Sequence, residues 1–119
     1  MTGAVKIFGG YLLMLFVYYS DVDPAIESDQ IIVTHFNAGW NDLNKVKYIK
    51  DLTDCTIVYV DIAASPKLQA KHNISVVPTV VIFKDGEEME RFQADISFSL
   101  KATKEDMQEV IDELIMSDF

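Results

Sequence analysis

The sequence predicts an α/β domain in which a central mixed β-sheet carries helices on both faces. An apolar, β-branched run over residues 31–36 passes through a short loop into a second apolar pattern that is typical of a helix. Residues 56–62 are apolar almost throughout, which indicates a strand buried on both faces and therefore covered by helices on both sides. Residues 79–84 form another strong strand pattern, and Asp85-Gly86 predicts a tight hairpin turn after it.

Composition limits the size and the partners of the protein. The 119 residues are half hydrophobic, which suffices for one domain with its own core, and we expect that domain over residues 31–119. The net charge of −9 argues against nucleic acid as a partner. Residues 81–119 carry eleven acids and four bases, a balance of −7, which indicates a solvated acidic face or a surface that docks on a basic protein.

Residues 1–30 form an apolar N-terminal segment and linker with two open interpretations. Residues 7–20 carry no charge, and this run reaches the length of about 20 residues that a membrane-spanning helix needs only if residues 2–5 join it and Lys6 extends toward the membrane surface. A membrane anchor, or a segment inserted into a partner, is therefore one interpretation. The other is a packed strand followed by a short helix over residues 23–28, with Asp23 as its cap.

The turn after the first strand pattern holds the positions that matter for chemistry. Phe36, Ala38 and Trp40 stand in a Phe-x-Ala-x-Trp pattern that resembles the active-site turn of thioredoxins, where Cys-x-x-Cys follows. Here the two cysteine positions carry Asn41 and Asn44. Dithiol exchange needs a thiolate and a second thiol that resolves the mixed disulfide, and a carboxamide offers neither. The resemblance therefore implies a divergent member of the thioredoxin-like superfamily, and we expect no dithiol oxidoreductase activity.

Two roles are open for these amides. Asn41 is expected to cap the helix that follows, because its side-chain oxygen can accept from the exposed N–H groups of the first turn. The apolar positions of that helix are Leu43, Val46, Ile49 and Leu52. In the alternative, Asn41 and Asn44 form a polar and aromatic patch with Trp40 that binds an extended peptide.

Residues 74–87 look like the thioredoxin segment in which a cis-proline precedes a strand and a hairpin. Proline is tolerated at the first residue of a strand, where no ladder hydrogen bond is lost. The resemblance implies a cis Val77–Pro78 bond that lies opposite the Asn-x-x-Asn turn. The degenerate binding surface that it implies consists of Trp40, Asn41, Asn44, Val77, Pro78 and Thr79.

Other positions depart from the thioredoxin pattern. The buried acid that shuttles protons in thioredoxins aligns with His35, which we expect to be a core histidine because there is no thiol for it to serve. The family's glycine after the last strand aligns with Gln93. Residues 94–102 form a longer link than usual, and their alternation of polar and apolar residues predicts an edge strand or a contact loop.

The ends of two helices are marked by capping residues. Ser65-Pro66 begins a helix that runs to about His72, where Asn73 is the expected stop. The last helix begins at Thr103, which forms a capping-box pattern with the acid three residues later. Its apolar positions are Met107, Val110, Ile111, Leu114 and Ile115.

No other pattern in the sequence predicts chemistry. The single cysteine, Cys55, follows Asp54, and a neighbouring carboxylate opposes formation of a thiolate. The two histidines fall into no metal-ligand spacing, and no phosphate loop or nucleophile elbow is present. We therefore expect no cofactor and no metal.

Three functions follow, in this order. The first is a redox-inactive, non-catalytic protein-binding or structural subunit of a large assembly, such as a virus particle or a membrane-associated complex. The second is a peptide-binding, chaperone-like domain of the protein-disulfide-isomerase type. The third is a one-cysteine thiol oxidoreductase that uses Cys55. An intracellular or particle-associated location is favoured, with the N-terminal anchor left open.

Overall fold

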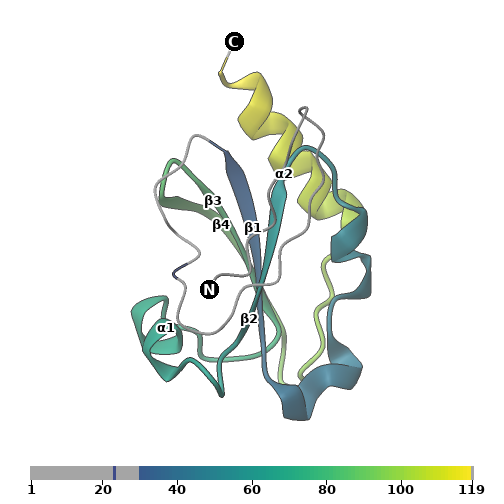
Figure 1. Cartoon of the computed structure of the whole chain (residues 1–119). Helices are drawn as coiled ribbons and strands as arrows, with labels where there is room; N and C mark the ends of the chain where they lie inside the picture. Colours follow the sequence, from purple (N-terminus) through teal and green to yellow (C-terminus); the bar gives the residue numbers. More distant parts are fainter. Residues whose placement is uncertain (1–22, 24–29, 119) are drawn as a thin grey trace, which may run out of the picture.

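The computed structural model describes residue 23 and residues 30–118 (Figure 1). The elements in chain order are β1 (Ile31–Asn37), η1 (Gly39–Asn44), η2 (Lys47–Asp51), β2 (Thr56–Asp61), α1 (Pro66–Lys71), β3 (Thr79–Lys84), β4 (Glu87–Gln93) and α2 (Lys104–Met116). The strand or anchor expected within residues 1–30 lies outside the described residues, apart from Asp23 and Gln30. The Asp23 carboxylate bonds the side chains of Lys71 and His72 at the end of α1.

The described sheet is mixed, as predicted, with the strand order β2-β1-β3-β4. β1 and β2 are parallel, in a register that pairs Ile32 with Thr56. β3 runs antiparallel to β1, and β4 runs antiparallel to β3. The hairpin turn between β3 and β4 places Asp85 at φ 56° and Gly86 at φ 80°, both in the left-handed region that such a turn requires.

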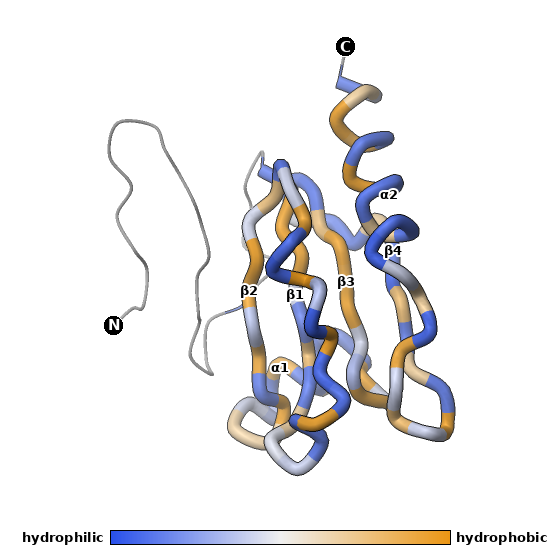
Figure 2. The backbone as a smooth tube through the Cα atoms, turned by 90° about the vertical axis from the view of Figure 1, so that its right-hand side faces the viewer, coloured by the Kyte–Doolittle hydropathy of each residue, from blue (hydrophilic) through white to orange (hydrophobic). Residues whose placement is uncertain are grey.

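Helices cover both faces of this sheet. On one face α2 and η2 pack against the strands, and the buried core there includes Val33, Ile49, Ile82, Met107 and Ile111. On the other face α1 packs against a second core, which includes Phe36, Val58, Leu68, Val81 and Phe83. Figure 2 shows hydrophobic stretches along β1, β2 and β3, whereas hydrophilic and hydrophobic residues alternate along α2. That alternation fits a helix with one face on the core.

The prediction of an α-helix directly after the turn is wrong. The chain forms two short 3₁₀-helices, η1 and η2, separated by extended backbone at Lys45 and Val46. Leu43 is 89% exposed, although it was expected to be a core residue of that helix, whereas Val46, Ile49 and Leu52 are buried. The apolar spacing of three residues matches the period of a 3₁₀-helix, in which residues i and i+3 eclipse.

The two predicted caps behave differently. Thr103 accepts from the backbone N–H of Asp106, and the Asp106 carboxylate accepts from the backbone N–H of Thr103, so the capping box at α2 is present. Ser65 occupies the N-cap position of α1, but its side chain makes no cap hydrogen bond and its buried hydroxyl has no partner among the described residues. Asn73 follows α1 at φ 54° and ends it as predicted. Within the described residues, none of the helices combines the length and the apolar character needed to cross a membrane.

Candidate functional site

The turn between β1 and η1 buries Asn41. Its backbone, at φ −112° and ψ 24°, is non-helical inside η1, and its side chain is almost fully buried. The position that caps η1 is Ala38, and no side chain caps it. The expected capping role of Asn41 is therefore wrong, because the side chain points into the protein rather than along the start of the helix.

The Asn41 amide is the centre of a hydrogen-bond network. Its Nδ2 shares two hydrogens among three acceptors, which are Asn37 Oδ1 at 3.1 Å, the Val77 carbonyl at 3.3 Å and the Phe98 carbonyl at 3.2 Å. Its Oδ1 accepts from Asn44 Nδ2 at 2.9 Å, and its backbone carbonyl accepts from Asn37 Nδ2 at 3.1 Å. One side chain thus joins the turn to two distant segments of the chain.

The proline segment lies against this turn. The Val77–Pro78 peptide bond is cis, as the resemblance implies. Val77, Pro78 and Thr79 are all buried. The Thr79 hydroxyl donates to the Val76 carbonyl at 2.7 Å, and the Pro78 carbonyl accepts from the backbone N–H of Ala94 at 3.1 Å. Asn41 therefore lies opposite the proline segment. The carbonyls of Val76 and Pro78 in that segment accept hydrogen bonds from within the chain.

The link over residues 94–102 forms a contact loop and no edge strand. Asp95 Oδ1 accepts from the backbone N–H of Ser97 at 2.8 Å, and Phe98 adopts φ 61°. This turn places the Phe98 carbonyl on Asn41 and the Phe98 ring edge-on to Trp40, with the ring centroids 5.5 Å apart. The loop thus contacts the turn at Asn41 and Trp40, two residues of the surface that the resemblance assigns to a bound peptide.

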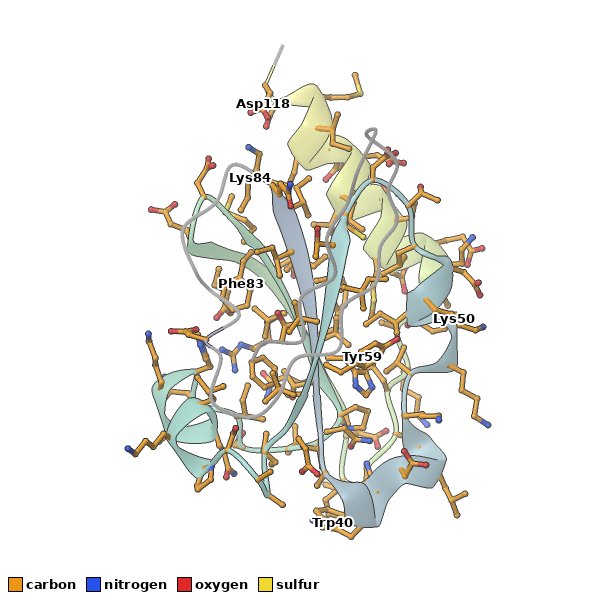
Figure 3. All side chains as sticks on the ribbon, in the orientation of Figure 1. Trp40, Lys50, Tyr59, Phe83, Lys84 and Asp118 are labelled. Atoms are coloured by element: carbon orange, nitrogen blue, oxygen red, sulfur yellow. The ribbon has the colours of Figure 1, made fainter. Side chains whose placement is uncertain are left out.

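Four large apolar side chains at this end of the protein face solvent. Trp40 is 68% exposed, Leu43 89%, Ile96 96% and Phe98 43%. They come from η1 and from the contact loop, and we call them the Trp40 patch. Figure 3 shows Trp40 at the far end of the molecule from Lys84 and Asp118. Exposed apolar side chains on two segments joined by the Trp40–Phe98 contact make this patch a candidate interaction surface.

His35 is a core residue beside this turn, as predicted. Its Nε2 accepts from the backbone N–H of Val46 at 3.1 Å, so the proton of the neutral ring sits on Nδ1. Its ring meets Tyr59 edge-on at 5.5 Å. Burial, together with the smaller effect of nearby Lys45, lowers the pKa of His35 to about 4. The ring is therefore uncharged at neutral pH.

Cys55 lies far from the Asn-x-x-Asn turn. It directly precedes β2, and because β1 and β2 are parallel, the start of β2 is at the opposite end of the sheet from the turn that follows β1. Burial raises the pKa of the Cys55 thiol to about 12, and Asp54 acts in the same direction. The thiol is protonated at neutral pH and is a poor nucleophile. No group of three metal-ligating side chains occurs in the described part of the chain.

Sequence reasoning missed two members of the site. Asn37 is the last residue of β1 and supplies both an acceptor and a donor to Asn41. Its signal was a second polar residue two positions after His35, on the same face of a strand that is otherwise apolar. The sequence signal for Phe98 was weaker. The alternation of polar and apolar residues within residues 94–102 predicts a contact loop, but it does not predict which residue the loop contacts.

The fold and the proline segment opposite the turn define a thioredoxin-like α/β domain. The family model described as Thioredoxin matches residues 20–113. The chain therefore belongs to the thioredoxin family.

Individual relatives match over different lengths. The thioredoxin of Chlamydia trachomatis serovar D is 44% identical over 41 residues, which are 34% of this chain and 40% of the relative. The thioredoxin of Mycoplasmoides gallisepticum is 26% identical over 74 residues, which are 57% of this chain and 74% of the relative. The chain thus spans less than half the length of the Chlamydia protein that it matches. The crystal structure of Schistosoma mansoni thioredoxin is similar with a TM-score of 0.66 at 21% identity, over 83% of this chain and 94% of that one, which shows the fold alone.

Proposed function

We propose that this chain is a thioredoxin-family protein without dithiol redox activity and that it serves as a non-catalytic, protein-binding subunit of a larger assembly. The observation that carries the proposal is the buried amide of Asn41. A reactive cysteine at such a turn is partly exposed and has a lowered pKa. Asn41 instead is buried and bonded through both atoms of its amide, so this position holds three segments together.

The name of the matched relatives, thioredoxin, favours a redox role. The chemistry of the described residues weighs against it. The resemblance assigns Asn41 and Asn44 to the cysteine positions, and Cys55 is half-buried, protonated and at the other end of the sheet. A thiol exchange needs a thiolate that reaches its substrate, and none of these three residues supplies one.

The Trp40 patch is the surface that we assign to the partner. Aromatic residues anchor protein interfaces because they bury a large area at a low cost in side-chain entropy. Trp40 is already held edge-on by Phe98, so less of its freedom is lost when a partner covers it. The fixed geometry favours one defined partner over many unfolded chains.

A chaperone-like role in peptide binding has less support. In the family, the residue before the cis-proline leaves its backbone open to pair with a bound peptide strand. Here Val77 is buried and its carbonyl accepts from Asn41, while the Phe98 carbonyl completes the same network. The exposed ring of Trp40 is the feature that favours this second function.

The redox part of the proposal is tested by a disulfide-reduction assay on the full chain. We expect a rate equal to the uncatalysed rate, and Cys55→Ser should leave it unchanged. A measurable rate for the natural chain that Cys55→Ser abolishes would contradict the proposal.

The binding part is tested by site-specific photocrosslinking in the cells that make the protein. A photoreactive residue at Leu43 or Ile96 should give one discrete product, and the same residue at the exposed Met116, on α2, should give none. With the photoreactive residue at Leu43, the added substitution Ile96→Ser should weaken the product and change the free energy of unfolding by less than about 0.5 kcal/mol, because the Ile96 side chain is exposed. A smear of many products would favour the chaperone-like function.

A further inference from the structure

A cavity of about 610 Å³ opens between the sheet and the segment that contains η1 and η2. Tyr59 of β2 and Lys50 of η2 both line it, and Figure 3 shows the two side chains near each other on the side of the molecule that carries η2. Cavities that hold small ligands have volumes of about 300 to 1,000 Å³. None of the four side chains of the Trp40 patch is among the residues that line it.

The inner wall of the cavity is apolar and aromatic. The rings of His35 and Tyr59 meet edge-on there, and Val46 and Val60 line the same space. Burial lowers the pKa of His35 to about 4, so its ring carries no charge at neutral pH. Burial also raises the pKa of the Tyr59 phenol, whose hydroxyl makes no hydrogen bond to the described residues. The wall thus offers flat contact surfaces and one free hydroxyl donor.

The mouth of the cavity carries three lysines and two aspartates. Lys45, Lys47 and Lys50 line it, and so do Asp42 and Asp61. Asp42 pairs with Lys45 at 4.0 Å, Lys50 pairs with Asp51 at 3.8 Å, and Asp61 Oδ1 accepts from a backbone N–H at 2.9 Å. Lys47 has no ion pair among the residues that the structure describes. In a chain with a net charge of −9, three of the ten basic residues fall within six positions here, and Lys47 is the one whose charge is left to attract an anion.

We propose that this cavity binds a small aromatic carboxylate. The ring lies against His35 and Tyr59, and the carboxylate lies at the mouth between Lys47 and Lys50. The apolar wall buries the aromatic ring of the ligand, and the lysines favour a ligand that carries a negative charge. This site is separate from the partner surface and does not depend on the loss of redox activity.

The chain offers a substitution that closes the cavity without strain. Gly39 lines the cavity, and a Cβ atom at this position would meet one atom, Asp61 Oδ2, at the ordinary contact distance of 3.8 Å. Gly39→Leu therefore projects a side chain into open space at the mouth. Gly39→Ala is the matched control, because it makes the same change in backbone freedom and leaves most of the volume.

The probe is 1-naphthoate, titrated into the full chain while backbone amide NMR shifts are followed. We expect saturable shifts centred on residues 35–39, 45–50 and 59–61. Gly39→Leu should abolish them, and Gly39→Ala should retain them. Lys47→Gln with Lys50→Gln should weaken binding roughly tenfold, whereas Lys67→Gln with Lys101→Gln, which removes the same charge elsewhere, should not.

Two further probes separate the ring from the charge. The neutral alcohol 1-naphthalenemethanol should bind roughly tenfold more weakly than 1-naphthoate, and inorganic phosphate alone should give no saturable shift. The proposal is overturned if 1-naphthoate gives no saturable shift at millimolar concentration, if the alcohol binds equally well, or if the shifts centre on Trp40 and Phe98. It is also overturned if Gly39→Leu, with an unchanged melting curve, still binds.

Discussion

Asn41→Asp is expected to lower the free energy of unfolding at neutral pH by about 3 to 5 kcal/mol, measured by urea denaturation. The substitution keeps the shape of the side chain but replaces Nδ2 by a carboxylate oxygen. That oxygen would face Asn37 Oδ1 and the carbonyls of Val77 and Phe98, all within 3.3 Å and none able to donate. A buried charge without a donor is among the most destabilising single changes.

The control is Asn73→Asp, the same chemical change at an exposed residue whose positive φ aspartate also tolerates. It should change stability by less than about 0.5 kcal/mol. The loss caused by Asn41→Asp should shrink as the pH falls, because a protonated aspartic acid can donate one hydrogen bond. Equal, small losses for both variants would show that Asn41 does not hold the turn, and the proposal of a structural role at the cysteine position would fail with it.

The elements that sequence patterns predicted well are those fixed by neighbours in the chain. The Asp85-Gly86 turn needs two residues with positive φ, and that requirement is local. The capping box needs Thr103 and Asp106, three residues apart. The two-sided burial of β2 follows from a continuous apolar run. The strand order was not predicted, because pairing between β1 and β3 joins residues that are far apart in sequence.

The environment of Asn41 could not be predicted in this way. Its burial depends on three acceptors from different parts of the chain, one of them at Phe98, 57 residues away. Viewed alone, an asparagine before a helical pattern is most often a cap. The exposure of Leu43 and Ile96 could not be predicted either. Whether an apolar side chain in a periodic pattern reaches the core depends on the path of the whole segment.

The second large expected effect is a loss of stability on acidification that comes from His35. Its pKa is about 4 in the folded protein, against 6.5 for the free side chain. Between these values the unfolded chain binds a proton that the folded chain does not, so the free energy of unfolding falls as the pH decreases from 6.5 to about 4. The full difference corresponds to about 3 kcal/mol, and below about pH 4 this contribution is constant.

His35→Gln should remove this pH dependence, since a glutamine carbonyl can still accept from the backbone N–H of Val46 but does not titrate. His72→Gln removes the other histidine of the chain and should leave the dependence in place. The measurement is urea denaturation of the three proteins at several pH values between 4 and 7, each compared with its own value at pH 7. If His35→Gln loses stability on acidification as steeply as the natural chain, the His35 ring is not buried in its neutral form. The conclusion that the cavity wall beside Tyr59 is uncharged would then be wrong.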